Sequence, residues 1–273
     1  MNKNDLAFAE KRLADPYWRL SNLYFVIDKH GSKVRFTPNW AQQELLKNLW
    51  FCSVILKSRQ VGVSTLICLL FLDRCLFNSN LAAGIICHTR EDSEHLFKRI
   101  KFAYDCLPES IKSARPATID SARELVFNNG SSLRVGTSMR GSTLQYLHIS
   151  EFGKICAKFP DKANEIITGS LNTIAPGQYV FIESTAEGRE GHFYEMCKQA
   201  KALADQEKEL SKLDFKFHFF PWWREPEYRI GNVTRLPQSS MNTFTLWRGK
   251  TSISPMSKSS GTLPGVLSSV MIC

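Results

Sequence analysis

Short apolar segments alternate along the chain with longer segments whose apolar residues recur at helical spacing. The segments typical of buried strands are VILKS (54–58), AAGIICHT (82–89), YLHIS (146–150), QYVFIEST (178–185) and DFKFHFF (214–220). Helix-length segments lie at residues 64–77, 91–107, 161–173 and 191–210. Strands that alternate with helices and are apolar almost throughout are typical of a parallel sheet covered on both faces. The pattern predicts an α/β fold with about five principal strands.

Three other stretches complete the predicted organisation. RELVFNN and SSLRVGT lie on either side of Gly130, so Asn129-Gly130 predicts the turn of a β-hairpin. Residues 1–35 are predicted to form an N-terminal helical segment, and residues 36–227 the α/β domain. Residues 228–273 contain no Asp or Glu, five basic residues and nine serines, without a helical or strand period. We expect this tail to be poorly structured, since little apolar surface offsets the entropy of ordering it.

The composition excludes several classes of protein. With 43% apolar residues the chain can bury a core, which excludes a wholly disordered protein. The longest apolar stretch, residues 66–72, is too short to span a bilayer, and the charged N-terminus lacks the apolar segment of a signal peptide. The eight cysteines are scattered without a C-x-x-C pair, which favours reduced thiols over zinc ligands or disulfides. We expect a cytoplasmic protein with no membrane segment.

The net charge of +9 says less about a nucleic-acid partner than its size suggests. Residues 1–227 carry 30 basic and 26 acidic side chains, and the remaining five positive charges belong to the tail. Charge distribution, rather than the total, identifies a binding surface for a polyanion.

The segment Lys57 to Thr65, KSRQVGVST, lies between the first predicted strand and an apolar helix. Backbone N–H groups at such a helix start bind phosphates, helped by the helix dipole. In the phosphate-loop pattern G-x-x-x-x-G-K-[ST], Gly62 and Ser64 match the last glycine and the Mg²⁺-binding hydroxyl. Val63 occupies the usual lysine position, whereas Lys57 occupies that of the first glycine. The segment predicts a phosphate loop; a strand-to-helix connection without a ligand is the alternative.

Two further strand ends carry polar residues. YLHIS is followed by Glu151, where P-loop enzymes place the acid that orients the attacking water. Ser150 stands where such a strand usually carries the Asp that supports Mg²⁺. The next predicted strand ends in Ser184 and Thr185, a position at which motor ATPases sense the γ-phosphate. A solvated Glu and a helix-capping Ser-Thr turn are the alternatives.

Arg140 lies in a Gly- and Ser-flanked loop before the YLHIS strand. An arginine that reaches the γ-phosphate accelerates phosphoryl transfer by roughly 10³–10⁵-fold. Arg140 is therefore predicted as an arginine finger for a neighbouring subunit. An ordinary loop arginine is the alternative, and Arg59 is the rival finger within its own subunit.

From about residue 36 to 223 the chain resembles the N-terminal ATPase half of the large terminase subunit of tailed bacteriophages. LKSRQVGVST resembles the S-R-Q-x-G phosphate loop of that family, in the variant whose lysine stands first. TSMRGSTLQYLHISEFG resembles its approach to the Walker B acid, and IESTAEG resembles its coupling motif. FTPNWAQQELLKNLW resembles its adenine-binding segment, with Gln42 as the base contact.

The resemblance implies a P-loop ATPase that uses ATP and Mg²⁺ to drive viral DNA packaging in the bacterial host cytoplasm. Its implied partners are double-stranded DNA, the small terminase subunit, the portal of the procapsid and further copies of the chain in a ring. The implied site residues bind nucleotide, bind Mg²⁺, catalyse hydrolysis or couple it to movement. They are Gln42, Lys57, Ser58, Arg59, Gln60, Gly62, Ser64 and Thr65 for nucleotide, with Ser64 also for Mg²⁺; Glu151 and Arg140 for catalysis; and Ser184 and Thr185 for coupling.

Two departures from the family pattern leave alternatives open. Ser150 in place of Asp weakens the expected support of Mg²⁺, and Val63 removes the usual charge from the helix start. A helicase-like ATPase and a truncated, inactive nucleotide-binding remnant are the alternative functions. Family members also carry a carboxylate-rich nuclease half, which we expect to be missing here because nothing after Glu227 is acidic. The abrupt change of composition suggests a truncation or a change of reading frame.

Overall fold

The computed structural model describes residues 10–139, 143–171 and 174–228. The chain divides after Pro221 into two units. The first unit contains the sheet and the helices that cover it. In the second unit, the described residues form two short 3-10 helices, Trp222–Arg224 and Pro226–Tyr228.

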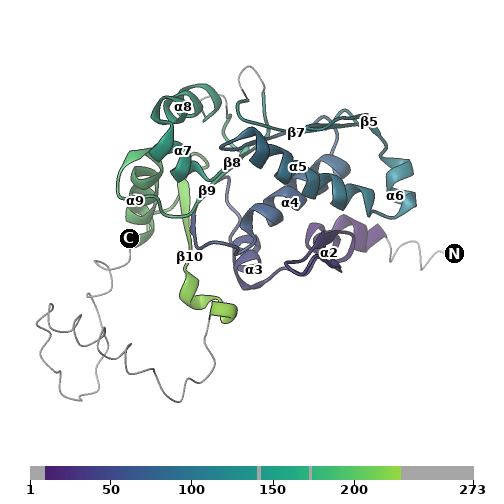
Figure 1. Cartoon of the computed structure of the whole chain (residues 1–273), viewed down its shortest axis with the longest axis horizontal. Helices are drawn as coiled ribbons and strands as arrows, with labels where there is room; N and C mark the ends of the chain where they lie inside the picture. The colour runs from purple at the N-terminus through teal and green to yellow at the C-terminus, as the bar shows by residue number, and fades with distance from the viewer. Residues whose placement is uncertain (1–9, 140–142, 172–173, 229–273) are drawn as a thin grey trace, which may run out of the picture. The chain divides into compact units, whose positions relative to one another are not determined.

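The centre of the first unit is an eight-stranded sheet (Figure 1), whose strands lie in the spatial order β10-β3-β9-β8-β4-β7-β6-β5. The strands from β10 to β7 are parallel, whereas β6 and β5 pair antiparallel at one edge. Their bounds are β3 Cys52–Lys57, β4 Ala82–Ile86, β5 Ala117–Asp120, β6 Glu124–Phe127, β7 Ser132–Gly136, β8 Tyr146–Ser150, β9 Tyr179–Ser184 and β10 Phe215–Phe220. The five predicted strands and the hairpin are confirmed. The sheet is larger than predicted because the hairpin and β5 extend its edge.

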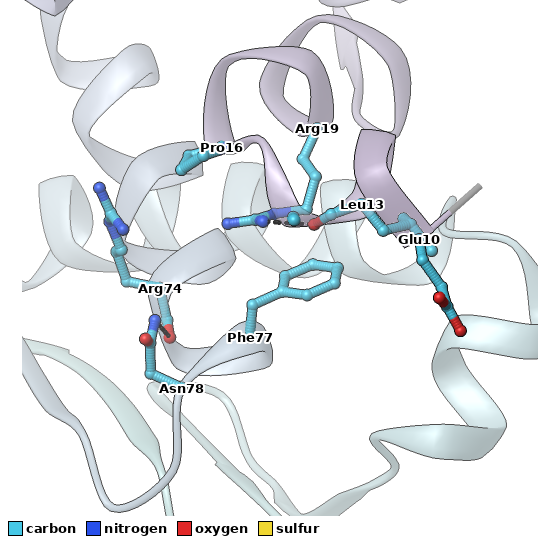
Figure 2. Close-up of a pocket in the computed structure, with 8 residues that line it drawn as sticks. Glu10, Leu13, Pro16, Arg19, Arg74, Phe77 and Asn78 are labelled. Atoms are coloured by element: carbon cyan, nitrogen blue, oxygen red, sulfur yellow. Dashed lines mark hydrogen bonds between the residues drawn. The ribbon is translucent and has the colours of Figure 1, made fainter. Parts of the chain in front are cut away.

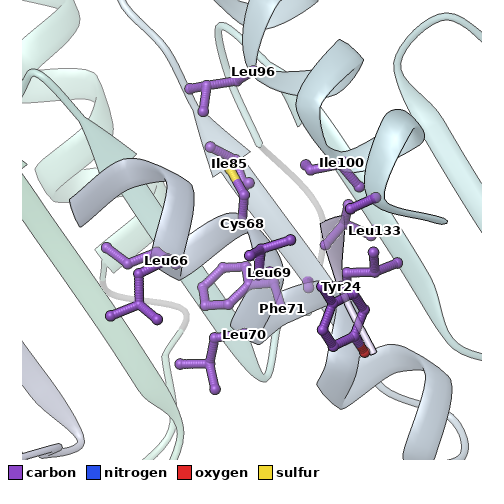
Figure 3. Packing of buried hydrophobic residues seen from close by; sticks show 14 of the residues in the cluster. Tyr24, Leu66, Cys68, Leu69, Leu70, Phe71, Ile85, Leu96, Ile100 and Leu133 are labelled. Atoms are coloured by element: carbon purple, nitrogen blue, oxygen red, sulfur yellow. The ribbon is translucent and has the colours of Figure 1, made fainter. Parts of the chain in front are cut away.

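Helices cover both faces of this sheet (Figure 1). The main helices are α4 (Val63–Phe77) and α5 (Arg90–Asp105) on one face, and α7 (Phe152–Lys158) and α9 (Gly191–Asp205) on the other. Successive residues of β9 alternate between two apolar clusters: Phe181 packs in the cluster with α4, and Ile182 in the cluster with α7. Figure 3 shows the first cluster, which includes Phe71 of α4 and Ile85 of β4.

Several helices differ from the predictions. The predicted helix over residues 161–173 is formed by α8 (Pro160–Glu165) and a π-helical turn, Ile166–Ser170, and the last two residues of the prediction lie outside the described residues. The long helix predicted over 191–210 ends at Asp205. The structure adds three short helices that the periodicity did not predict: α3 (Trp40–Lys47), α6 (Glu109–Ala114) and α7.

The N-terminal segment is only partly helical. Helix α2 (Pro16–Asn22) is followed by an antiparallel hairpin of β1 (Phe25–Ile27) and β2 (Lys33–Arg35). Its turn is closed by Asp28, whose side chain accepts hydrogen bonds from the backbone N–H groups of His30 and Ser32. The prediction of a helical segment over residues 1–35 therefore overlooked a turn that an Asp side chain stabilises.

A buried ion pair joins this N-terminal segment to α4. Both carboxylate oxygens of Asp73 accept hydrogen bonds from Arg19, at 2.8 and 2.6 Å, and the Tyr24 hydroxyl donates to Oδ1 at 2.9 Å. The Arg19 guanidinium also lies over the Phe77 ring, 4.1 Å from its centroid. Arg19, Tyr24 and Asp73 are buried, so each depends on its partners for the hydrogen bonds that water would provide.

Replacement of Asp73 by asparagine is expected to lower the free energy of unfolding by about 3 kcal/mol, since it leaves the buried Arg19 charge uncompensated. Urea unfolding followed by circular dichroism measures this change. Asp205→Asn, which removes an exposed partner of Lys201, is the control and should cost less than about 1 kcal/mol. Equal effects of the two substitutions would contradict the assigned role of Asp73.

A buried histidine in β10 makes stability depend on pH. Burial is the main cause that lowers the pKa of His218 from 6.5 to about 4, with a smaller contribution from Lys216. The unfolded chain therefore binds the proton more tightly, so stability is full above pH 6.5 and declines as the pH falls towards 4. We expect the free energy of unfolding to fall by about 2 kcal/mol more between pH 7.5 and pH 5 in wild type than in His218→Gln. Identical pH profiles in urea unfolding would exclude this assignment.

Seven of the eight cysteines lie in the described residues, and all seven are free thiols. Five of them are buried: Cys52, Cys68, Cys75, Cys87 and Cys197. Burial raises the pKa of the Cys52 thiol to about 11, and that of Cys197 to about 12. These thiols remain protonated at neutral pH and pack as apolar groups.

In the described part of the chain, no helix has the length and apolar character needed to cross a membrane.

Candidate active site

The loop between β3 and α4 requires glycine at position 62. Gly62 has a φ of +79°, and its carbonyl accepts a hydrogen bond from Gln42 Nε2 at 2.8 Å. A Cβ atom at this position would lie 2.7 Å from that same Nε2 atom. A larger residue is therefore excluded both by the backbone conformation and by the side chain that approaches it.

Gln42 and Asn39 hold this loop from helix α3. Their side chains and backbone N–H groups form a reciprocal capping box at the start of the helix. Asn39 Nδ2 donates to the Val61 carbonyl at 2.9 Å, next to the Gln42 bond to Gly62. Gln42 is buried and its amide supports the loop, which indicates a positioning role. The assignment of Gln42 as the base contact remains a prediction.

Lys57, the last residue of β3, lies between two carboxylates. Its Nζ atom is 2.9 Å from Glu151 Oε1 and 3.0 Å from Glu183 Oε2. β9 lies between β3 and β8 in the sheet, so the ends of these three parallel strands bring the groups together. Burial would lower the pKa of Lys57, but Glu183 and then Glu151 raise it above its ordinary value. Lys57 is therefore a buried cation at the beginning of the predicted phosphate loop.

Glu151, the N-cap residue of helix α7, has an unusual backbone conformation. Its φ of 54° and ψ of 45° are left-handed, a region that non-glycine residues adopt mostly where the surroundings impose it. Its Oε2 atom faces the end of β9: Thr185 N and Oγ1 lie at 3.4 and 3.3 Å, and Ser184 Oγ at 3.5 Å. The predicted catalytic acid therefore contacts both predicted coupling residues.

Glu183 is a site residue that the sequence reasoning missed. It is fully buried in β9, and its Oε1 accepts hydrogen bonds from Ser64 Oγ at 2.7 Å and Ser150 Oγ at 2.9 Å. His148 Nε2 lies 3.4 Å from the same oxygen. Burial would raise the pKa of Glu183, but the Lys57 charge and the His148 ring lower it well below its ordinary value. Glu183 is thus ionised although it is buried near the carboxyl end of β9.

A signal for Glu183 was present in the sequence. Residues 179–184, YVFIES, form a strand with a single charged residue, and strands covered on both faces bury their side chains. A carboxylate in such a strand is expected to have a buried partner. The identity of the partners depends on strand order and register, because Glu183 lies opposite Ser150 in the pairing of β8 with β9.

The other predicted nucleotide-binding residues lie around the same loop. Ser58 N donates to the Phe220 carbonyl of β10 at 2.8 Å, which fixes the start of the loop. Arg59 and Gln60 are exposed, and Gln60 has a left-handed φ of 59°. Thr65 Oγ1 lies 3.5 Å from Arg99 Nη1 of α5. Arg140 lies outside the described residues.

A separate pocket of about 460 Å³ lies at the C-terminal end of α4 (Figure 2). Its lining combines residues of the N-terminal segment with residues at the C-terminal end of α4. They are Glu10, Leu13, Ala14, Pro16, Arg19, Arg74, Phe77 and Asn78. Because α4 begins at the predicted phosphate loop and ends at this pocket, the pocket is not the candidate active site.

The side chains at the loop have the chemistry of a phosphate and Mg²⁺ site. Lys57 forms ion pairs with Glu151 and Glu183, and Glu183 accepts a hydrogen bond from the hydroxyl of Ser64 in the first turn of α4. Oxygen ligands of this kind suit Mg²⁺, which keeps several waters and is bound by few protein groups. Groups of three or more His, Cys, Asp or Glu side chains able to hold a metal by themselves are not found in the described residues.

Comparison with known proteins gives structural relatives only. No protein-family model matches the sequence, and no curated protein is significantly similar to it. The large terminase of bacteriophage HK97 superposes with a TM-score of 0.54 and 14% identity, over 88% of this chain and 52% of its own. The ATPase domain of the Thermus phage P74-26 large terminase gives 0.48 and 15%, over 76% of this chain and 92% of its own.

This chain spans about half the length of the HK97 protein. At 14% identity the similarity establishes the fold alone. The structure confirms the predicted α/β class with a mostly parallel central sheet, and the chain shares this fold with the HK97 phage large terminase.

Proposed function

We propose that this chain is an ATPase motor subunit of the phage-terminase type, which hydrolyses ATP to drive viral DNA into a procapsid. The observation that carries the proposal is the convergence of Lys57 and Glu151, 2.9 Å apart, beside the helix start at Ser64. A cation for phosphates, an acid for water and a hydroxyl for Mg²⁺ are the parts that phosphoryl transfer requires.

In this proposal Lys57 and the backbone N–H groups near Gly62 bind the β- and γ-phosphates, and Ser64 contributes its hydroxyl to Mg²⁺. Bound Mg²⁺ would neutralise the charge that develops on the phosphate oxygens. Glu151 accepts the proton of the attacking water or holds that water in line with the γ-phosphate. Its carboxylate lies against Lys57 at the end of β3, next to the loop.

Ser184 and Thr185 would couple hydrolysis to movement through their contacts with Glu151 Oε2. A change in what Glu151 binds alters those contacts, and β9 continues into the segment before α9. Arg140 is proposed to act on the site of a neighbouring subunit, which requires a homo-oligomeric ring. The remaining proposed partners are double-stranded DNA, the small terminase subunit and the portal.

A packaging assay separates this proposal from a helicase-like function. Purified chain is incubated with ATP, Mg²⁺, procapsids, small terminase subunit and linear duplex DNA, and protection of DNA from nuclease is measured. Unwinding of a labelled duplex is measured in parallel without procapsids. Protection without unwinding supports the packaging motor. Unwinding without protection would replace it by the helicase-like ATPase.

A further inference from the structure

We propose that Glu183 is the carboxylate that supports the Mg²⁺ of the bound nucleotide. It takes the role of the Asp that is expected at position 150, where this chain has the uncharged Ser150. This inference rests on the proposed ATPase function and names one more residue of the same site. The carboxylate that is expected at the end of β8 is carried instead by the neighbouring strand β9.

The strand pairing places Glu183 where the missing charge is needed. Ser150 and Glu183 are direct partners in the parallel pairing of β8 with β9. The Ser150 hydroxyl donates to Glu183 Oε1 at 2.9 Å, so the side chain of β9 fills the position that a longer acidic residue on β8 would reach. Serine at position 150 is therefore matched to a carboxylate on the adjacent strand.

Glu183 also contacts the residue proposed to bind Mg²⁺. Its Oε1 accepts the hydrogen bond of Ser64 Oγ at 2.7 Å, close to the N-terminus of α4. A carboxylate that accepts a hydrogen bond from a metal-binding group, or from a metal-bound water, orients that ligand and strengthens its binding. The second oxygen, Oε2, is enclosed and accepts no well-oriented hydrogen bond from the described residues; its polar neighbour is Lys57 Nζ.

The ion pair with Lys57 explains how this carboxylate is balanced before nucleotide binds. A fully buried carboxylate requires a cation nearby, and Lys57 supplies it at 3.0 Å. When Lys57 turns to the phosphates, Glu183 requires another cation at the same place. Mg²⁺ bound near Ser64 together with the nucleotide would supply that positive charge, so Lys57 and Mg²⁺ would balance Glu183 in turn.

Fluorescence titration with mant-AMP-PNP, in Mg²⁺ and in EDTA, tests this role. For wild type we expect Mg²⁺ to tighten binding, and for Glu183→Gln we expect that tightening to shrink by about 10-fold or more. Binding in EDTA should be unchanged or tighter in Glu183→Gln, because one negative charge near the phosphates is gone. A merely structural role of Glu183 would instead weaken binding in both conditions. Glu190→Gln, an exposed residue, is the matched control and should alter neither value.

Returning a carboxylate to β8 should rescue the effect. The double variant Ser150→Asp/Glu183→Gln is expected to recover most of the Mg²⁺-dependent tightening. Full tightening in a folded Glu183→Gln variant would overturn the inference and leave the ATPase proposal standing. Absence of mant-AMP-PNP binding in wild type would overturn the ATPase proposal itself.

A crystal structure of the wild-type chain with Mg²⁺ and AMP-PNP tests the same point without a substitution that alters the core. A Glu183 oxygen bound to Mg²⁺ or to one of its waters is the expected result. Glu183 still paired with Lys57 and separated from the metal would overturn the inference.

Discussion

Lys57→Ala is expected to reduce ATP hydrolysis by roughly 10²–10³-fold, the usual cost of removing one charge that stabilises the transition state. The same substitution should lower the free energy of unfolding by about 3–5 kcal/mol, since Glu183 loses the cation that compensates its buried charge. Phosphate release and urea unfolding measure the two effects. The position matters because Lys57 stands at the end of β3 and not at the usual place in the loop.

A double substitution separates the two effects of Lys57. Lys57→Met/Glu183→Gln removes both charges, so it should recover most of the lost stability while hydrolysis stays at background. Lys158→Ala, which removes an exposed lysine on α7, is the control and should change neither quantity. Wild-type hydrolysis by a folded Lys57→Ala variant would exclude Lys57 as the phosphate-binding cation.

Glu151→Gln is expected to reduce hydrolysis by roughly 10²–10⁴-fold, as for other general bases, while nucleotide binding remains within a few-fold of wild type. The amide has nearly the same shape and can still accept the contacts from Thr185, but it cannot take a proton from water. Lys57 keeps Glu183 as its counterion, so the variant should fold. Single-turnover phosphate release and mant-AMP-PNP titration measure the two quantities.

The exposed Glu190→Gln substitution is again the matched control for Glu151, since it removes the same charge from a nearby loop. It should leave both hydrolysis and binding unchanged. If Glu151→Gln hydrolysed ATP at the wild-type rate, the catalytic acid would have to lie elsewhere in the chain.

Most of the fold could be predicted from hydrophobic periodicity, because both faces of a parallel sheet are buried and its strands are nearly continuous apolar runs. The N-terminal hairpin was missed because β1 and β2 have three residues each, too short for a period to show. Its signal was the Asp28 to Ser32 turn, whose stability comes from side-chain hydrogen bonds rather than from periodicity.

Part of the candidate site could also be predicted from the sequence. Lys57, Ser64 and Glu151 stand at ends of elements, where a parallel sheet collects its functional groups. Glu183 lies one residue inside a strand, and its role depends on β9 lying next to β8 with Ser150 opposite. Strand order and register arise from tertiary packing, so a search for motifs along the sequence could not reveal that contact.

Release of phosphate from ATP is the most direct test of the central claim, that the loop at Lys57 and the acid at Glu151 form an ATPase site. The purified wild-type chain and the Lys57→Ala and Glu151→Gln variants are compared at saturating ATP and Mg²⁺, with and without duplex DNA. The account predicts release by wild type that requires Mg²⁺ and is reduced at least about 100-fold in both variants. Equal release at background by all three proteins, each shown to be folded, would contradict it.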